Sequence, residues 1–368
     1  MTAKRLRVAI VPNAPAPYRH VVYELIASDP NVDLRVIFCS GREPDREWDL
    51  VDERKHILLK ERVFVVNGRF IHFNLDILSA LRTFRPEVVI TTGFNPTHLI
   101  AYAYSRWCGA HHVVMTDGTF LSEQKLSFIH RWVRKRIFSK TNVFIGASDG
   151  AFDLFRSYGI TNNKMFKSHL CADNVAFFAE PVIQKKYDFI FCGRFVALKN
   201  PFFALKVAQK VAQRLGRPVS MIFVGSGELD QEIRAAAAAV QHEVRAVFSG
   251  FALQKQLPQR YRSARLFLFP TKWEPWGVVA NEACAAGVPV LISDVAVSAR
   301  ELVRDGENGF VLPLVMDRWA DAAVQILTND DLYNRMSARC CELVKEYTYE
   351  NAAKGIVLAI NAAKSTIA

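Results

Sequence analysis

The sequence predicts an α/β chain with two doubly wound parallel sheets. Short β-branched runs alternate with longer segments of helical period, which is typical of parallel sheets flanked by helices. The length of 368 residues suits two domains. The alternation restarts after Glu180–Lys186, a segment with a proline, two lysines and no periodicity. We therefore predict an N-terminal Rossmann-like domain over 1–180 and a second one over 187–345.

The first domain is expected to contain five strands with helices between them. The predicted strands are Leu6–Pro12, Leu34–Ser40, Val88–Thr92, His112–Thr116 and Val143–Ala147. The predicted helices lie near Tyr18–Ser28, Leu75–Phe84, Thr97–Cys108 and Lys125–Ser139.

The second domain starts a fresh series of strands. They are read in "YDFIFCGR", "VSMIFVGSG", "AVFSGF", "RLFLFPT", "VPVLISD" and "NGFVLPL". Ligands of open parallel sheets bind beyond the carboxyl ends of the strands. Two such domains facing each other would place their strand-end loops on opposite walls of one cleft, so we look for chemistry at strand ends.

Composition describes a soluble globular chain with a basic excess. Apolar residues make up 51%, charged residues 23%, and the net charge is +11. This charge suits an anionic partner, which phosphate on a small molecule, lipid headgroups or nucleic acid would all provide. The seven cysteines show no CxxC spacing, which favours reduced thiols and a cytoplasmic location. The apolar stretch at the N-terminus is too short for a signal peptide, and we expect no membrane-spanning helix.

The first strand of the second domain leads into "CGRFVALKNP". This places Gly193, Arg194 and Lys199 on a strand-to-helix loop, with Asn200 as a cap and Pro201 at the first helical position. Two cations beside a helix N-terminus suit a phosphate or diphosphate. Two solvated surface charges are the alternative.

The segment "PTKWEPWGVVANEACAAGVPVLISD" carries two carboxylates near another helix start. Glu274 lies on a loop, Gly277 opens the helix, and Glu282 lies inside it. Both acids can face one ligand over the helix start, and a carboxylate can accept hydrogen bonds from neighbouring sugar hydroxyls. Equally, they could be a loop acid and a helix-surface acid.

These segments resemble a known enzyme family. "GRFVALKN", "VGSGEL", "FSGF", "FLFPTKWEPWGVVANEACAAGVPVLISD" and "ELVRDGENGFVL" follow the order and spacing seen in the retaining GT-B glycosyltransferases of family 4, the glycosyl transferases group 1. The resemblance covers about Tyr187 to Leu312. It implies a GT-B fold and transfer of a sugar from a UDP- or GDP-sugar with retention. The ending "EYTYENAAKGIVLAI" resembles the family's final helix, so 346–368 is expected to cross back to the first domain.

The resemblance also implies roles for individual residues. Arg194 and Lys199 would hold the donor diphosphate, Glu274 the transferred sugar and Glu282 the ribose hydroxyls. The full set of expected donor-binding residues is Gly193, Arg194, Lys199, Gly225, Ser226, Glu274, Trp276, Gly277, Val278, Val279 and Glu282. The family's front-face mechanism needs no protein nucleophile, because the leaving phosphate oxygen takes the acceptor's proton.

The sequence gives no reason to expect a metal or another cofactor. It has no DxD at a strand end and no His/carboxylate cluster with ligand spacing. His111 and His112 begin a strand with alternating faces, and we interpret them as structural. The nucleotide sugar is then a co-substrate, and fixed cations near the diphosphate would lower the barrier.

The first domain is expected to hold the acceptor, a glycan or glycolipid. "VPNAPAPYRH" follows the first strand and would present Asn13, Tyr18 and Arg19, although a turn that merely caps a helix is equally consistent with it. "VVMTDGTF" ends another strand and offers Asp117 as a base or hydroxyl anchor, a fourth candidate catalytic residue with Glu274, Arg194 and Lys199.

A basic amphipathic stretch lies between Lys125 and Lys140. It contains six Lys or Arg and no acid, interleaved with Trp and Phe at near-helical spacing. Such a helix fits an anionic membrane surface, and the chain would then be peripheral on the cytoplasmic face. A core-facing helix with a solvated basic face would give the same pattern.

Two other function classes fit parts of the sequence. A nucleotide-sugar-binding subunit of a glycan-synthesis complex would keep the donor site without catalysis. A nucleic-acid binder would use the positive charge, but the basic residues are dispersed and no basic stripe carries stacking aromatics, so we expect no nucleic-acid partner.

Overall fold

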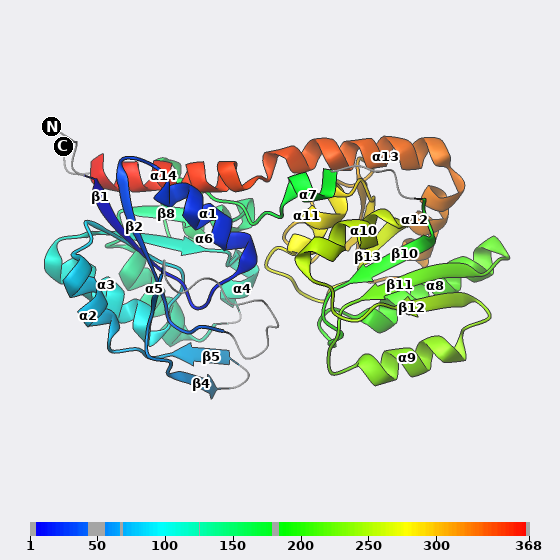
Figure 1. Cartoon of the computed structure of the whole chain (residues 1–368), viewed down its shortest axis with the longest axis horizontal. Helices are drawn as coiled ribbons and strands as arrows, with labels where there is room; N and C mark the ends of the chain where they lie inside the picture. The colour runs from blue at the N-terminus through cyan, green and yellow to red at the C-terminus, as the bar shows by residue number, and fades with distance from the viewer. Residues whose placement is uncertain (1–4, 43–55, 67–68, 125, 179–183, 366–368) are drawn as a thin grey trace. The chain divides into compact units, whose positions relative to one another are not determined.

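The computed structural model describes residues 5–42, 56–66, 69–124, 126–178 and 184–365 (Figure 1). The chain divides into two compact units. The first comprises Met1–Leu170 and Tyr349–Ala368, and the second comprises Cys171–Thr348. This division falls before Glu180–Lys186, where the sequence predicts the boundary, because residues from Asn174 onward pack within the second unit: the Asn174 side chain donates to the carbonyls of Val344 and Tyr347.

The first unit is a parallel sheet with helices around it. Its strands are β1 (Leu6–Val11), β2 (Val32–Phe38), β3 (Ile57–Leu58), β6 (Val88–Thr91), β7 (His111–Thr116), β8 (Val143–Gly146) and β9 (Met165–Lys167), with a separate antiparallel hairpin of β4 (Val63–Val66) and β5 (Arg69–His72). Its helices are α1 (Pro17–Ala27), α2 (Ile77–Phe84), α3 (Pro96–Cys108), α4 (Phe120–Gln124), α5 (Phe128–Phe138), α6 (Asp149–Ser157) and α14 (Tyr349–Ser365).

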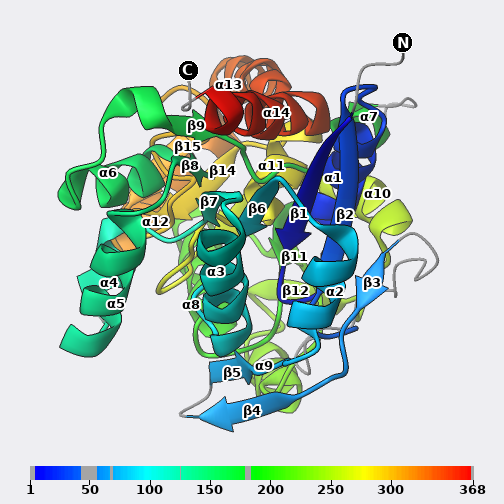
Figure 2. The same ribbon diagram turned by 90° about the vertical axis from the view of Figure 1, so that its left-hand side faces the viewer.

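The strand order of this sheet is β3-β2-β1-β6-β7-β8-β9, and every pairing is parallel. Figure 2 shows α2 and α3 side by side along the sheet, and α14 close to α1. One face of β1 buries Ala9 and Val11 against Ile77 and Leu81 of α2. In this sheet the strand order reverses at β1, which lies between β2 and β6.

The last helix approaches the sheet closely at one glycine. A Cβ on Gly355 of α14 would lie 1.8 Å from the carbonyl oxygen of Lys167 in β9. Gly355→Ala is therefore expected to force α14 away from the sheet and to lower the free energy of unfolding by about 3 kcal/mol. Thermal unfolding tests this, with the exposed neighbour Lys354→Ala as the control. Equal midpoints for the two variants would contradict this packing.

The second unit repeats the architecture. Its strands are β10 (Tyr187–Cys192), β11 (Val219–Val224), β12 (Val244–Phe248), β13 (Ala264–Phe269), β14 (Val290–Ser293) and β15 (Gly309–Leu312). Its helices are α7 (Asn174–Phe178), α8 (Pro201–Leu215), α9 (Asp230–Ala239), α10 (Leu257–Arg262), α11 (Val278–Ala285), α12 (Met316–Thr328) and α13 (Asp330–Leu343). The described 3₁₀ turns are Gln254–Gln256 and Val344–Glu346 in this unit and Asn162–Lys164 in the first unit.

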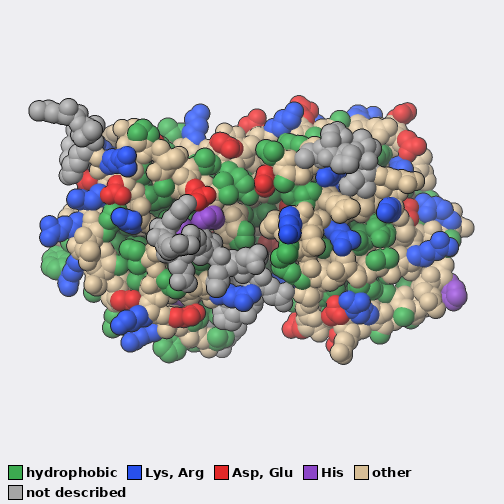
Figure 3. All heavy atoms as spheres, in the orientation of Figure 1, with side chains coloured by type: hydrophobic (Ala, Val, Ile, Leu, Met, Phe, Trp, Pro, Cys, Tyr) green, Lys and Arg blue, Asp and Glu red, His purple; other side chains and the backbone are tan. Residues whose placement is uncertain are grey.

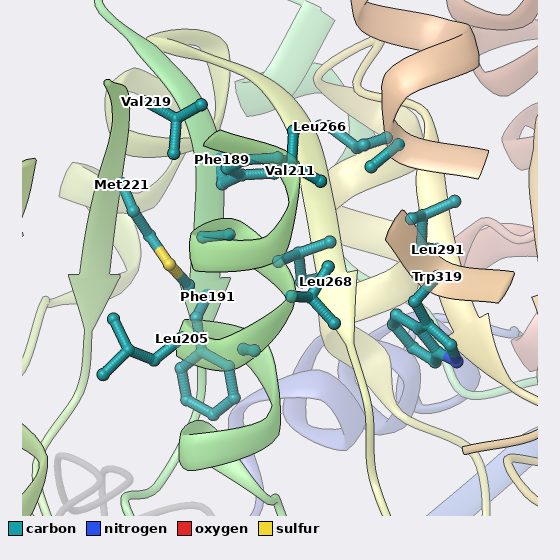
Figure 4. Packing of buried hydrophobic residues seen from close by; sticks show 14 of the residues in the cluster. Phe189, Phe191, Leu205, Val211, Val219, Met221, Leu266, Leu268, Leu291 and Trp319 are labelled. Carbon is teal, nitrogen blue, oxygen red and sulfur yellow. The ribbon is translucent and has the colours of Figure 1, made fainter. Parts of the chain in front are cut away.

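The parallel order β12-β11-β10-β13-β14-β15 places β10 where the strand order reverses. Apolar residues of the strands pack against α8 and α12, as Figure 4 shows for Phe189 and Phe191 on β10 and Leu205 on α8. Trp319 of α12 is fully buried in the same core. The two doubly wound sheets confirm the predicted α/β fold class of the GT-B type. The expectation that the units face each other across a cleft stays a prediction.

Candidate active site

The switch point of the second sheet, where the strand order reverses, is at β10, which lies between β11 and β13. In doubly wound sheets this is where ligands bind, beyond the carboxyl ends of the strands. Gly193 and Arg194 follow β10, Gly225 and Ser226 follow β11, and the loop to α11 follows β13. The structure therefore brings three of the sequence-predicted segments to one edge of one sheet.

The loops after β10 and β11 are joined by backbone hydrogen bonds. The Gly193 amide donates to the Val224 carbonyl at 3.0 Å, and the Phe195 amide donates to the Ser226 carbonyl at 2.8 Å. Gly225 has a φ of 134°, and a Cβ there would lie 2.0 Å from the Gly193 carbonyl oxygen. Only glycine permits this close approach, so the backbone itself forms this part of the site.

Lys199 and Glu274 form the central side-chain contact of the site. Lys199 stands just before α8, whose first residue is Pro201 as predicted, and its Nζ donates to Glu274 Oε2. The two loops are tied together again by the Lys272 amide, which donates to the Leu198 carbonyl at 2.8 Å. Both side chains are largely buried. A cation and a carboxylate are thus held side by side at the sheet edge, and half-buried Arg194 belongs to the same loop.

Helix α11 begins at Val278, four residues after Glu274. Gly277 is its N-cap residue, with a φ of 92°, and Val278 and Val279 form its first turn. Amides in the first turn of a helix lack intrahelical acceptors, so this end favours anionic oxygen. The Glu274 backbone is fixed from the other side, since its carbonyl accepts from the Val297 amide at 3.1 Å.

The Gly277 position leaves no room for a side chain. An added Cβ would lie 2.5 Å from the Phe269 ring and 3.1 Å from Glu274 Cγ. Gly277→Ala is expected to lower the free energy of unfolding by about 3 kcal/mol through strain and overpacking. Gly306→Ala is the matched control, because Gly306 also has a positive φ of 75° but no atoms within 4 Å of an added Cβ. Thermal unfolding of both variants measures the difference, and equal losses would contradict it.

Glu282 lies on α11 and is almost fully buried. Its Oε2 accepts from the Tyr261 hydroxyl at 3.0 Å. Burial raises the pKa of Glu282 to about 7, against the opposing effect of the Tyr261 hydrogen bond. Burial and, secondarily, the Glu282 carboxylate also raise the pKa of the Cys192 thiol at the end of β10.

The sequence missed Tyr261. It lies on α10, next to β13, and neither its position nor its neighbours in the chain distinguish it from a core residue. Its side chain is fully buried, and the pairing with Glu282 joins α10 to α11, 21 positions apart in the sequence.

Trp276 stands just before the start of α11. It is expected among the donor-binding residues, but its indole is fully buried. The indole Nε1 donates to Asn281 Oδ1 at 2.8 Å. The centroids of the Trp276 and Tyr347 rings lie 5.5 Å apart. The Trp276 carbonyl accepts from the Ser298 hydroxyl at 2.6 Å. The side chain therefore supports the start of α11 from inside the unit.

In the first unit, two expected acceptor residues follow strand ends. Asn13 follows β1, where its side chain accepts from Asn95 at 3.1 Å, and exposed Asp117 follows β7. Tyr18 is half-buried in the first turn of α1. Parallel strands place Asn13 and Asp117 at the same edge of the sheet.

Arg19 differs from the expectation that it is presented to an acceptor. Its guanidinium is buried, donating to the Ser168 hydroxyl at 2.9 Å and to the Ser168 carbonyl at 3.2 Å. These bonds connect α1 to the segment after β9. The sequence does not show this role, because the partner lies far along the chain.

The His112 ring is buried, and both of its nitrogens contact threonine hydroxyls. Its Nδ1 lies 2.8 Å from Thr141 Oγ1 and its Nε2 lies 3.0 Å from Thr91 Oγ1, and burial lowers its pKa to about 3. Across the described ranges, no group of three or more His, Cys, Asp or Glu side chains is arranged to hold a metal ion. No helix in the described part of the chain has the length and apolar character to cross a bilayer.

Comparison with known proteins finds a family match within the second unit. Residues 173–340, somewhat less than half of the chain, match the family described as Glycosyl transferases group 1. This region contains the loops after β10 and β11, Glu274 and α11.

Individual relatives match over the same part of the chain. The chain is 32% identical over 180 residues to D-inositol 3-phosphate glycosyltransferase of Nocardia farcinica, covering 47% of this chain and 40% of the relative. It is 31% identical over 170 residues to phosphatidyl-myo-inositol mannosyltransferase of Mycobacterium leprae, covering 46% and 44%. The matches thus span less than half the length of these curated relatives.

Solved structures match over nearly the whole chain. Anabaena Alr3699/HepE, crystallised in complex with UDP, has a TM-score of 0.76 at 15% identity, covering 97% of this chain and all of that one. This likeness shows that the fold of both units is shared.

Proposed function

We propose that this chain is a retaining glycosyltransferase. It transfers a sugar from a UDP- or GDP-sugar to a hydroxyl of a lipid-linked or cell-surface glycan intermediate. The observation that carries the proposal is the Lys199–Glu274 pair beside the start of α11, at the switch point of a sheet whose region matches the glycosyl transferases group 1. A diphosphate and a sugar hydroxyl are the two chemical groups that such a cation and carboxylate suit.

Each group of the site has a proposed task. Lys199, Arg194 and the first-turn amides of α11 hold the diphosphate, while Glu274 accepts hydrogen bonds from the transferred sugar. The Gly193, Gly225 and Ser226 backbone lies against the nucleoside. Glu282 accepts the ribose hydroxyls.

Transfer breaks the bond between the anomeric carbon and the phosphate oxygen, and the electron pair leaves with the diphosphate. Lys199 and the helix start stabilise this developing negative charge, an effect worth about 3 kcal/mol for one such interaction. The acceptor oxygen bonds to the anomeric carbon from the same side, and its proton goes to the leaving phosphate oxygen. In this proposal protein cations neutralise the diphosphate, so we expect turnover to persist in EDTA.

The first unit is proposed to bind the acceptor through Asn13, Tyr18 and Asp117. Arg19 is left out, because Ser168 already engages its guanidinium. Asp117 is exposed at the end of β7, which suits a hydroxyl anchor or a base.

A two-stage experiment tests the function. Thermal shift with UDP- and GDP-sugars identifies the donor, since a ligand at 100 times its dissociation constant adds about 2.7 kcal/mol of stability. Release of UDP or GDP in the presence of polyprenyl-linked and soluble glycan acceptors then measures transfer, and NMR of the product shows whether the anomeric configuration is retained. Donor binding without transfer to any acceptor would indicate a non-catalytic binding subunit. Neither binding nor transfer would overturn the proposal.

A further inference from the structure

Helix α5 exposes large apolar side chains. The exposed fractions are 74% for Phe128, 70% for Ile129 and 59% for Trp132. Core packing accounts for the opposite side of the helix, where Ile137 and Phe138 are buried with Phe144 and Phe155. The amphipathic stretch therefore has two apolar sets, and the outward one has no role in the core.

The outward set is flanked by cations. At 3.6 residues per turn, Phe128, Trp132 and Ile129 fall within an arc of about 100° on the helix. Arg131 and Lys135 lie along one side of this arc, and both are exposed. Exposed Arg136 lies between Trp132 and Ile129 on the same projection. No Asp or Glu occurs from Gln124 to Ser148, so the positive charge of this segment is not offset within it.

Side-chain contacts attach the inward side of α5 to the first unit. Glu123 on α4 is buried and accepts from both Arg134 of α5 and Tyr158, next to α6. The Arg134 guanidinium also lies 4.4 Å from the Phe94 ring centroid. These contacts fix the orientation of α5, and the Glu123 carboxylate neutralises the charge of Arg134. Figure 2 shows α4 and α5 at the margin of the first unit.

We propose that this outward face of α5, made of Phe128, Ile129, Trp132, Arg131, Lys135 and Arg136, docks on an anionic lipid bilayer. Aromatic side chains enter the headgroup region while neighbouring cations attract the negative surface. The charge pattern and the solvent-exposed aromatics on one arc both fit this partner. The docking itself does not depend on the proposed function. Its benefit does, because docking would bring the enzyme to a lipid-linked acceptor.

Sedimentation with vesicles of phosphatidylglycerol and phosphatidylcholine in equal amounts tests the docking, using the full chain without donor. The wild type is expected to bind these vesicles and not pure phosphatidylcholine. Arg131→Gln/Lys135→Gln should lower the partition coefficient about thirtyfold, from the loss of two cations. Phe128→Ser/Trp132→Ser should lower it about tenfold or more.

Two matched controls separate this face from general surface properties. Trp107→Ser removes a tryptophan on α3 whose exposure of 72% exceeds the 59% of Trp132, and Lys354→Gln/Lys364→Gln removes two exposed cations on α14. Both are expected to bind vesicles as the wild type does. Circular dichroism and the thermal midpoint check that every variant is folded.

Failure of the wild type to bind anionic vesicles would overturn the proposal, as would equal losses in the controls and in the α5 variants. Binding of the α5 face to RNA or to a protein with no vesicle binding would also overturn it. Donor binding measured on the same samples reports the proposed function separately, so failure of one is distinguishable from failure of the other.

Discussion

Lys199→Ala is expected to reduce kcat/KM for sugar transfer by about a hundredfold or more. The variant loses the cation that stabilises the departing diphosphate, an interaction worth about 3 kcal/mol in comparable sites. It also leaves the Glu274 carboxylate without its ion-pair partner, close to the position where negative charge develops. Steady-state kinetics with the donor found by thermal shift provides the measurement.

Lys206→Ala is the control for this loss, because Lys206 lies exposed on α8, the helix that follows Lys199. It is expected to leave kcat/KM unchanged. A Lys199→Ala enzyme with wild-type turnover would remove Lys199 from the proposed mechanism.

Glu282→Gln is expected to stabilise the protein above neutral pH. The pKa of Glu282 is raised by burial from 4.5 to about 7 in the folded protein. Between these values the folded state holds a proton that the unfolded state has released, so this group's contribution to stability is lost as the pH rises through about 7. The full loss is about 3 kcal/mol, and glutamine avoids it.

Chemical unfolding from pH 5 to pH 8 measures this effect. The advantage of Glu282→Gln over the wild type should grow with pH and level off above about 7. Tyr261→Phe removes the hydroxyl whose hydrogen bond lowers the pKa of Glu282, so the window should move to higher pH. The exposed Glu232→Gln on α9 is the control. An advantage that does not change with pH would contradict the raised pKa.

The same substitution is expected to weaken donor binding if Glu282 accepts the ribose hydroxyls. A carboxylate that costs stability at the pH where it is ionised is consistent with a functional group held in a dry environment. Its stabilising replacement would then carry a functional cost.

Local patterns predicted much of the fold. The strand at Val88–Thr92 is observed at Val88–Thr91, and the helix opened by Gly277 begins at Val278. Glycine, proline and β-branched residues act through the backbone of their own segment, so these features are legible in the sequence. The helix predicted over Lys125–Ser139 begins at Phe128, because the Ser127 side chain accepts from the His130 amide and caps it. Lys125 itself lies outside the described residues.

Side-chain partners could not be predicted in the same way. The site loops were found because parallel strands place their carboxyl ends at one edge. The burial of Trp276, the Arg19–Ser168 bonds and the Tyr261–Glu282 pair depend on which distant segments meet. Alternation and helical period do not encode such meetings. The sequence also does not separate the two apolar sides of α5. Only the burial of Phe138 in the core shows which apolar residues face inward and which face outward.

The basic excess is distributed widely. On the face drawn in Figure 3, Lys and Arg side chains lie scattered among Asp and Glu. We therefore expect ligand binding to depend on the specific placement of Lys199 and of the cations on α5 more than on the net charge.

Calorimetric titration with UDP, GDP and the corresponding monophosphates tests the central claim, that the edge of the second sheet at β10, β11 and β13 binds the diphosphate of a nucleotide sugar. We expect one diphosphate to bind more tightly than its monophosphate. Arg194→Ala/Lys199→Ala should abolish most of this difference, while Lys206→Ala should preserve it. Equal affinity of the double variant and the wild type for the diphosphate would contradict it.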